Sequence, residues 1–316
     1  MTNQRKGRVM ANQKVVVVGV DGSEASLAAV DWAVAEAKQA GMRLHIVCAY
    51  ALPSFTAASL DGGYAAMDDT AIQQGAQAVV EEAVVRVGDA DVVVTSALET
   101  GDPAGVLVDL SREAALVVVG TRGGGGFTDR LLGTVSSALP AHAHCPVVVV
   151  PVREGRTYMP IRRLVVGVDG SESARVALRR AVDEAAVWDA ELTAVAAVPI
   201  ATGAGAMAWL PATVDREEVL ADVREGLGVA VAGAVGDRPV RVRQHALDGN
   251  AAALMAEFST AVELIVVGTR GRGGFAGLLL GSTSQAVLHH AASPVMVVPS
   301  RVKDEGRSPS DVPWNA

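Results

Sequence analysis

Short apolar runs alternate along this chain with longer segments of helical periodicity. In the first half the runs are too apolar to alternate with polar positions, as expected of strands covered on both faces. They are residues 14–20, 43–49, 91–98, 115–120 and 146–151. Residues 23–40 and 69–87 instead place apolar side chains at i, i+3, i+4 and i+7, and Asp102-Pro103 and Thr134 mark two further helix starts. This alternation predicts a parallel sheet with helices on both faces.

The second half of the chain repeats the first half at a constant offset of 148 residues (268 − 120). The segment "VVGVDGSE" at 17–24 recurs at 165–172, and the glycine-rich loop after Gly120 recurs after Gly268. We therefore expect two tandem, doubly wound (Rossmann-like) α/β domains, each with a five-stranded parallel sheet. The expected division is an N-terminal tail at 1–13, a first domain at 14–152, a linker at 153–161, a second domain at 162–300 and a disordered tail at 301–316.

Both repeated motifs lie where strands end. "VGVDGS" follows the first strand of each half, and the glycine loop follows the fourth. Ligands of doubly wound sheets bind at the carboxyl ends of the strands, near the point where the strand order reverses. Consecutive glycines leave backbone N–H groups open to an anion, and the helix starts at Thr134 and Ser282 favour phosphate. The alternatives are a tight strand-to-helix turn for the loop and an Asx turn for Asp21.

Other phosphate-binding motifs do not fit the chain. It contains no G-x-x-x-x-G-K-[ST] segment, which excludes a Walker loop. "GRGGFA" at 271–276 matches the dinucleotide pattern G-x-G-x-x-A, but it follows the fourth strand rather than the first.

The spacing G-x2-G-x9-G-[ST] occurs twice, once from Gly120 to Thr134 and once from Gly268 to Ser282. It resembles the ATP-binding signature of the universal stress protein family. The segments "VGVDGSEAS", "VGVDGSESA", "CPVVVVP" and "SPVMVVP" resemble that family as well. The resemblance covers almost the whole chain apart from the two tails, and the tandem form is similar to actinobacterial members.

The resemblance implies a nucleotide role for particular residues. Asp21 and Asp169 would contact the ribose or metal-associated phosphates, and Val47 and Val195 would meet adenine through their backbone. The residues that would hold the phosphates are Gly120, Gly123, Gly133, Thr134, Gly268, Gly271, Gly281 and Ser282. Three arginines follow the strand ends: Arg122, Arg270 and Arg272. They are either further phosphate contacts or ordinary loop arginines. We expect ATP as the ligand, with Mg²⁺ arriving with ATP rather than held by a metal site of the protein.

The composition bears on the class of binding partner and on the cellular location. The net charge of −8 argues against nucleic acid, and the polar N-terminus does not resemble a signal peptide. The uncharged stretch 192–214 is interrupted by Pro199 and Pro211, so we interpret it as a strand and a loop rather than a membrane span. Cys48 and Cys145 show no metal-ligand spacing and suit a reducing cytoplasm.

No catalytic constellation repeats across the two halves. His142, His144, His289 and His290 fall near the end of the last helix of each half, where a cation suits the helix dipole. We therefore expect an ATP-binding stress-response regulator rather than a rapid enzyme. The alternatives are a slow ATPase, a nucleotidyl- or phosphotransferase, or a binder of another adenine nucleotide such as cyclic AMP. We also expect a homodimer, because an apolar edge strand is normally paired or covered, and a regulatory protein partner that the sequence does not identify.

Overall fold

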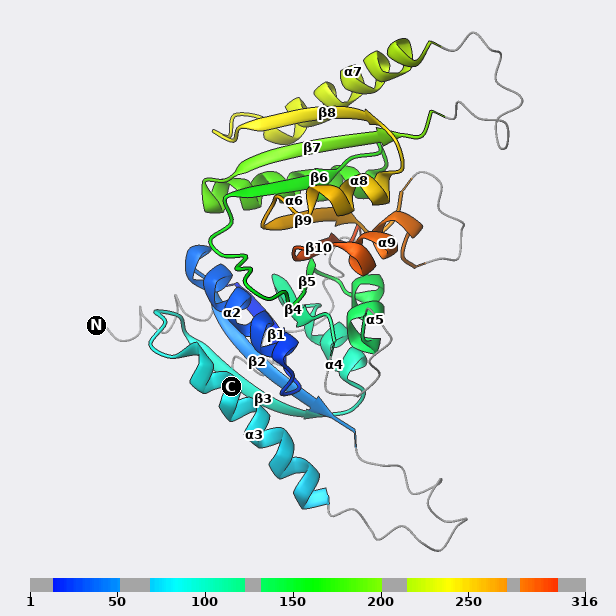
Figure 1. The fold of residues 1–316 in the computed structure, drawn as a ribbon. Coiled ribbons are helices and arrows are strands. Elements are labelled where there is room, and N and C mark those ends of the chain that lie inside the picture. Colours follow the sequence, from blue (N-terminus) through cyan, green and yellow to red (C-terminus); the bar gives the residue numbers. More distant parts are fainter. Residues whose placement is uncertain (1–13, 52–68, 123–131, 201–214, 272–278, 301–316) are drawn as a thin grey trace, which may run out of the picture. The chain divides into compact units, whose positions relative to one another are not determined.

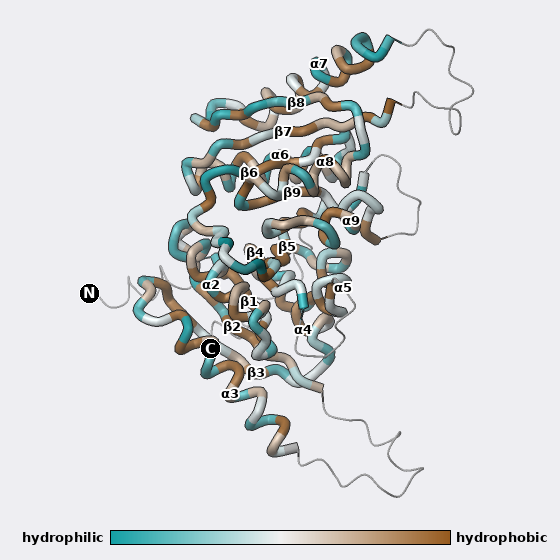
Figure 2. The backbone as a smooth tube through the Cα atoms, in the orientation of Figure 1, coloured by the Kyte–Doolittle hydropathy of each residue, from teal (hydrophilic) through white to brown (hydrophobic). Residues whose placement is uncertain are grey.

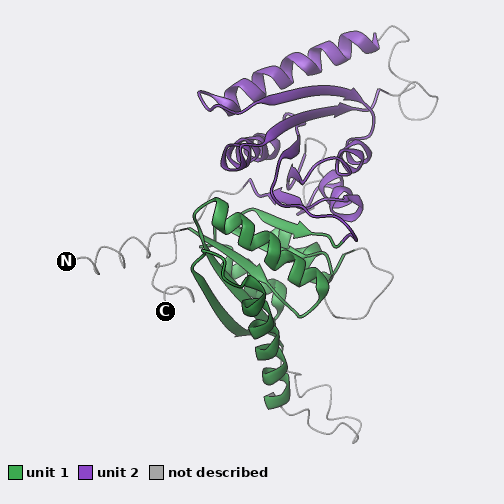
Figure 3. Ribbon diagram, turned by 60° about the vertical axis from the view of Figure 1, so that its left-hand side comes forward, with its two compact units in different colours: residues 1–152, 302–316 green, residues 153–301 purple. Residues whose placement is uncertain are grey.

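A computed structural model describes residues 14–51, 69–122, 132–200, 215–271 and 279–300. They form two compact units that divide between Val152 and Arg153 (Figure 3). The elements of unit 1 are β1 (Val15–Gly19), α2 (Glu24–Gln39), β2 (Arg43–Tyr50), α3 (Asp69–Val87), β3 (Val94–Thr100), α4 (Pro103–Leu110), β4 (Leu116–Gly120), α5 (Thr134–His142) and β5 (Val147–Val150). Those of unit 2 are β6 (Arg163–Gly167), α6 (Glu172–Trp188), β7 (Glu191–Val198), α7 (Arg216–Val235), β8 (Val242–Asp248), α8 (Ala251–Phe258), β9 (Leu264–Gly268), α9 (Ser282–His290) and β10 (Val295–Val298). The expected tails at 1–13 and 301–316 lie outside the described residues.

Each unit contains a parallel sheet with the same strand order. The order is β3-β2-β1-β4-β5 in unit 1 and β8-β7-β6-β9-β10 in unit 2 (Figure 1). In unit 1, α2 packs with α3, and α4 packs with α5. Right-handed crossovers put these two helix pairs on opposite faces of the sheet. The predicted fold of two tandem doubly wound domains is therefore confirmed.

The helices begin at residues that can cap them. Ser23 accepts a hydrogen bond from the Ser26 N–H at 3.2 Å, and Asp102 accepts one from the Gly105 N–H at 2.8 Å. Pro103 occupies the first turn of α4, where its missing N–H costs no helical bond. Apolar and polar segments alternate along α3 and α7 (Figure 2), as expected of helices with one face on a sheet. None of the helices in the described part is both long and apolar enough to span a membrane.

The third strand differs from its prediction. Residues 91–98 were expected to be extended, whereas β3 runs from Val94 to Thr100. A turn precedes the strand, with the Val92 N–H bonded to the Ala90 carbonyl at 2.7 Å. The strand ends at Thr100, and the N–H of the next residue, Gly101, donates to the Tyr50 carbonyl on β2 at 2.9 Å. Pairing with β2 therefore decides where β3 begins and ends.

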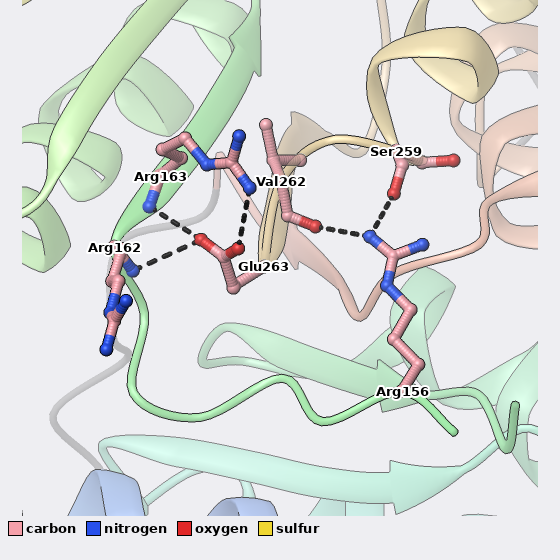
Figure 4. A network of polar contacts seen from close by, with 6 residues as sticks. All are labelled: Arg156, Arg162, Arg163, Ser259, Val262 and Glu263. Carbon is pink, nitrogen blue, oxygen red and sulfur yellow. Dashed lines mark hydrogen bonds and ion pairs between the residues drawn. The ribbon is translucent and has the colours of Figure 1, made fainter. Parts of the chain in front are cut away.

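Residues 153–161, expected as a linker, lie with unit 2 in the division of the chain. The Arg156 guanidinium donates to the carbonyls of Ser259 and Val262 at 2.7 and 2.8 Å (Figure 4). Ser259 is the C-cap of α8, so the cation also meets the negative end of that helix. The Tyr158 hydroxyl donates to the Ala292 carbonyl at 3.1 Å. Side chains of this segment therefore bind the segment to the body of unit 2.

We expect Arg156→Ala to lower the free energy of unfolding of unit 2 by about 2 kcal/mol, because two charge-assisted hydrogen bonds are lost. Urea unfolding read by mass spectrometry of pulse-labelled peptides would follow the two units separately. The exposed neighbour Arg153 is the control, and Arg153→Ala should change stability by less than about 0.5 kcal/mol. Equal effects of the two substitutions would contradict the proposed role of Arg156.

Candidate functional site

Three segments that are far apart in the sequence meet at the carboxyl ends of β1 and β4. Asp21 follows β1, Thr121 and Arg122 follow β4, and Gly133 precedes α5. The Ser23 hydroxyl donates to the Arg122 carbonyl at 3.1 Å, and the Gly133 N–H donates to the Thr121 carbonyl at 2.8 Å. The chain moves outward from β1 in one direction through β2 and in the other through β4, so this is the switch point of the sheet.

A tight turn fixes the Asp21 carboxylate. Its Oδ1 atom accepts hydrogen bonds from the N–H and the hydroxyl of Ser23, at 3.1 and 2.6 Å. Gly22 has φ +78°, a left-handed conformation that glycine adopts without strain. The Asx turn considered as an alternative is therefore present. The turn also holds an exposed carboxylate at the carboxyl end of β1, so it is compatible with a ligand-binding role.

The first glycine of each motif is required by packing. A Cβ atom on Gly120 would lie 2.5 Å from the carbonyl carbon and oxygen of Ala25, in the first turn of α2. A Cβ on Gly268 would lie 2.9 Å from the carbonyl carbon of Ser173, in the first turn of α6. These glycines therefore allow the helix that follows Asp21 or Asp169 to approach the strand that leads into the glycine loop.

In unit 2 the second glycine of the motif lies beside the acidic residue. A Cβ on Gly271 would collide with Oδ2 of Asp169. Oδ1 of the same carboxylate accepts from the Ser171 N–H at 2.9 Å. The structure thus brings Asp169 and Gly271 together, as the sequence predicts. Gly123 and Arg272 lie outside the described residues.

The N-termini of α5 and α9 complete the loop side of the site. Gly133 and Gly281 are the N-caps, so Thr134 and Ser282 are the first helical residues, and both are exposed. First-turn N–H groups have no partner within their own helix and carry the positive end of the helix dipole. This arrangement suits an anion.

Two further serines, not among the predicted site residues, bond to the described ends of these loops. The Ser136 hydroxyl accepts from the Gly133 N–H at 3.0 Å and lies 2.7 Å from the Thr121 carbonyl, to which it donates. The Ser284 hydroxyl donates to the Gly268 carbonyl at 2.6 Å. Their sequence signal is a hydroxyl residue three positions after the cap, the spacing of a capping box.

The backbone of Val47 is engaged in the sheet. Its carbonyl accepts from the Val20 N–H at 2.9 Å, and the Val195 carbonyl accepts from the Val168 N–H at 2.8 Å. In a parallel strand, alternate residues direct both backbone groups to the same neighbour. Ala49, two residues after Val47, therefore faces the side of β1, but β1 has already ended at Gly19.

The equivalent position in unit 2 is Ala197. The next residue, Tyr50, faces β3 instead: its carbonyl accepts from the N–H of Gly101, which directly follows that strand. Ala49 and Ala197 are half-buried, whereas Val47 and Val195 are only 1% and 2% exposed. By this alternation we expect the backbone groups directed at the site to belong to Ala49 and Ala197, two residues after the predicted Val47 and Val195.

The remaining polar candidates do not build a catalytic centre in the described part of the chain. Arg122 and Arg270 are exposed at the loop entrances, where their carbonyls accept from Ser23 and Ser171. His142 lies in the last turn of α5, and His289 and His290 in the last turn of α9, at the opposite end of each helix from Gly133 and Gly281. No group of His, Cys, Asp or Glu among the described residues could hold a metal ion.

Both cysteines are buried thiols, and neither forms a disulfide in the part of the chain that the structure describes. Burial raises the pKa of the Cys48 thiol, and the Asp21 carboxylate raises it further. The thiol therefore stays protonated at neutral pH, which disfavours a nucleophilic role.

Comparison with known proteins identifies the family. The model of the universal stress protein family matches residues 13–151 and again 160–299. A universal stress protein of Mycobacterium tuberculosis (strain H37Rv) is 34% identical over 308 residues, which cover 89% of this chain and 95% of the relative. One from Mycolicibacterium smegmatis is 33% identical over 299 residues, covering 92% and 99%.

Solved structures share the fold. A universal stress protein from Archaeoglobus fulgidus superposes with a TM-score of 0.65 at 20% identity, covering 92% of this chain and 98% of its own. A putative universal stress protein from Pseudomonas aeruginosa gives a TM-score of 0.57 at 19% identity, covering 92% and 95%. The chain belongs to the universal stress protein family and carries two copies of its domain in tandem.

Proposed function

We propose that each unit binds one adenine nucleotide, with ATP as the expected ligand, and that the protein acts in the cytoplasm through nucleotide occupancy rather than rapid catalysis. Membership of a stress-response family supplies the physiological setting. The observation that carries the proposal is the convergence of an acidic turn, the two described ends of the glycine-rich segment and a helix N-terminus at the switch point of each sheet.

The loop side fits phosphates. The N-termini of α5 and α9 offer first-turn N–H groups and a partial positive charge, and the exposed hydroxyls of Thr134 and Ser282 lie beside them. Arg122 and Arg270 stand at the loop entrances and would add charge. Asp21 and Asp169 would face the ribose hydroxyls or the Mg²⁺ that accompanies ATP.

The strand side fits adenine better than guanine. From the alternation of backbone groups along a parallel strand, we expect Ala49 and Ala197 each to direct a backbone N–H and a C=O past the ends of β1 and β6. Adenine offers a ring-nitrogen acceptor next to its N6 amino donor, which complements that pair. Guanine carries the O6 acceptor instead, which would oppose the carbonyl. A backbone pair of this kind therefore selects adenine without any specific side chain.

Regulation by occupancy is favoured over catalysis. The described residues of the site include carboxylates, hydroxyls and backbone groups, and the helical histidines named above lie at the far helix ends. A rapid ATPase needs a base placed to activate water. Slow hydrolysis, or transfer of a phosphoryl or nucleotidyl group, is the second candidate, because an exposed Asp21 could orient a water.

We predict that the purified protein binds ATP at two sites per chain and prefers it to GTP. Calorimetry with each nucleotide, and mass spectrometry of nucleotide released from the purified protein, would measure this. The matched variants Asp21→Ala and Asp169→Ala should each weaken one site. Multiple-turnover hydrolysis of ATP at about 10 s⁻¹, a typical enzyme rate, would contradict the proposal that the protein acts through nucleotide occupancy. Equal binding of GTP would contradict the assignment of the base.

We also propose that the protein forms a homodimer. The apolar strands β5 and β10 each end the strand order of their unit. An apolar edge is normally paired or covered, by the other unit or by a second chain. Light scattering should give twice the chain mass of 32.3 kDa, and a monomer at high micromolar concentration would contradict the proposal.

A further inference from the structure

One carboxylate joins three elements at the carboxyl edge of unit 2, close to Ala197. Asp248 is the last residue of β8, and its Oδ1 atom accepts from the Ile200 N–H at 3.0 Å. Its Oδ2 atom accepts from Nε of Arg216, the first residue of α7, at 2.8 Å. Ile200 lies two residues beyond the end of β7. The backbone that follows Ala197 is thus attached to β8 and α7 through one side chain.

Asp248 is ionised at neutral pH. Its pKa is lowered from the ordinary value, first by the hydrogen bond from Arg216 and then by the one from Ile200. The Asp248 side chain is 22% exposed and that of Arg216 is 52% exposed. Glu217 also approaches the Arg216 guanidinium, at 3.8 Å. The shorter contact and the backbone hydrogen bond both belong to Asp248.

Unit 1 carries different residues at these positions. With the offset of 148, Thr100 at the end of β3 replaces Asp248, and Asp68 replaces Arg216. Asp68 lies outside the described residues, but its charge is fixed by the sequence. A threonine and an aspartate cannot form an aspartate–arginine pair. The attachment is therefore specific to unit 2.

We infer that Asp248 is a positioning residue for the base side of the unit 2 site and that it gives this site a stronger hold on adenine than unit 1 has. The inference rests on the proposed function and extends it to the base. The Ala197 N–H and C=O lie three residues before the Ile200 N–H that Asp248 holds. A strand end fixed before binding loses less conformational entropy when the base binds.

Asp248→Thr, which installs the unit 1 residue, tests the inference. Protection of unit 2 peptides in hydrogen–deuterium exchange would be titrated with adenosine and, separately, with tripolyphosphate. We expect the adenosine affinity of unit 2 to fall about two- to fivefold, which corresponds to the loss of roughly one partly exposed charge pair, and its tripolyphosphate affinity to stay the same. The control Asp183→Asn removes another aspartate–arginine pair of unit 2, with Arg238, and should change neither affinity.

The reciprocal change strengthens the test. Asp68→Arg with Thr100→Asp should raise the adenosine affinity of unit 1. An equal loss of adenosine and tripolyphosphate binding in Asp248→Thr would indicate a general structural role and overturn the inference. Unchanged adenosine binding would overturn it while leaving the proposed function intact. Failure of the unchanged chain to bind ATP or adenosine would overturn the proposed function and this inference with it.

Discussion

Replacing Gly120 by alanine is expected to destabilise unit 1 by about 3 kcal/mol and to weaken nucleotide binding there by more than tenfold. The added Cβ atom would lie 2.5 Å from two backbone atoms of Ala25, which cannot move away as the end of a flexible side chain could. Overpacking of this kind typically costs 1 to 3 kcal/mol, and backbone collisions fall at the upper end. The helix α2 must shift relative to β4, and Ser23 at its cap then loses the Arg122 carbonyl.

The control for this prediction lies on the same unit. A Cβ on Gly75, in α3, would meet no atom within 4 Å. Gly75→Ala should therefore stabilise the helix by about 0.5–1 kcal/mol and leave nucleotide binding unchanged. Urea unfolding resolved by unit, and calorimetry with ATP, would measure both quantities. If Gly120→Ala behaved like Gly75→Ala, the close approach of α2 to β4 would not be essential.

Elements whose signal is local could be predicted well from the sequence. Periodicity placed the second helix at 69–87, where α3 runs from Asp69 to Val87. The offset of 148 residues then extended the fold of one unit to the other. The limits of β3 could not be predicted in this way, because hydrogen bonds to β2 determine them, and β2 lies more than forty residues earlier in the chain.

The candidate site was predictable where chemistry depends on residue type. Asp169, from the repeated motif after the first strand, and Gly271, from the glycine spacing, lie so close together that a Cβ on Gly271 would collide with the carboxylate. Residue type gives no sign of the expected role of Ala49, because that role depends on its backbone. Ala49 is expected to face the side of β1 because it lies two residues after Val47, and β1 has already ended at Gly19. The packing role of Gly120 depends on α2, a tertiary neighbour that spacing does not reveal.

The second large effect concerns acid and a buried histidine of unit 1. His45 lies in the middle of β2 with no exposed surface, and its Nδ1 atom is 2.9 Å from the Thr95 hydroxyl on β3. Arg43, two residues earlier and therefore on the same face of the strand, is also buried. Burial lowers the pKa of His45 to about 4, and the positive charge of Arg43 contributes. Unit 2 has Thr193 at the equivalent position.

The sign of the pH effect follows from this lowered pKa. Between the ordinary value of 6.5 and about 4, the unfolded chain binds a proton at His45 that the folded chain does not. The neutral, buried His45 ring therefore leaves the free energy of unfolding of unit 1 at its full value above pH 6.5. That free energy decreases as the pH falls from 6.5 to about 4. The difference between the pKa of 6.5 in the unfolded chain and about 4 in the folded chain corresponds to about 3 kcal/mol of unfolding free energy in total.

We expect the free energy of unfolding of unit 1 to fall by about 2 kcal/mol between pH 7 and pH 5 because of His45 alone. His45→Thr, which installs the residue of unit 2, should remove this part of the pH dependence. The slope with pH is the informative quantity, because the smaller side chain also leaves a cavity that lowers stability at every pH. Urea unfolding of the full chain, resolved by unit, would give the slope, and an NMR titration of the His45 ring would give its pKa directly. A ring that titrates near 6.5, or a slope unchanged in His45→Thr, would show that His45 does not make unit 1 sensitive to acid.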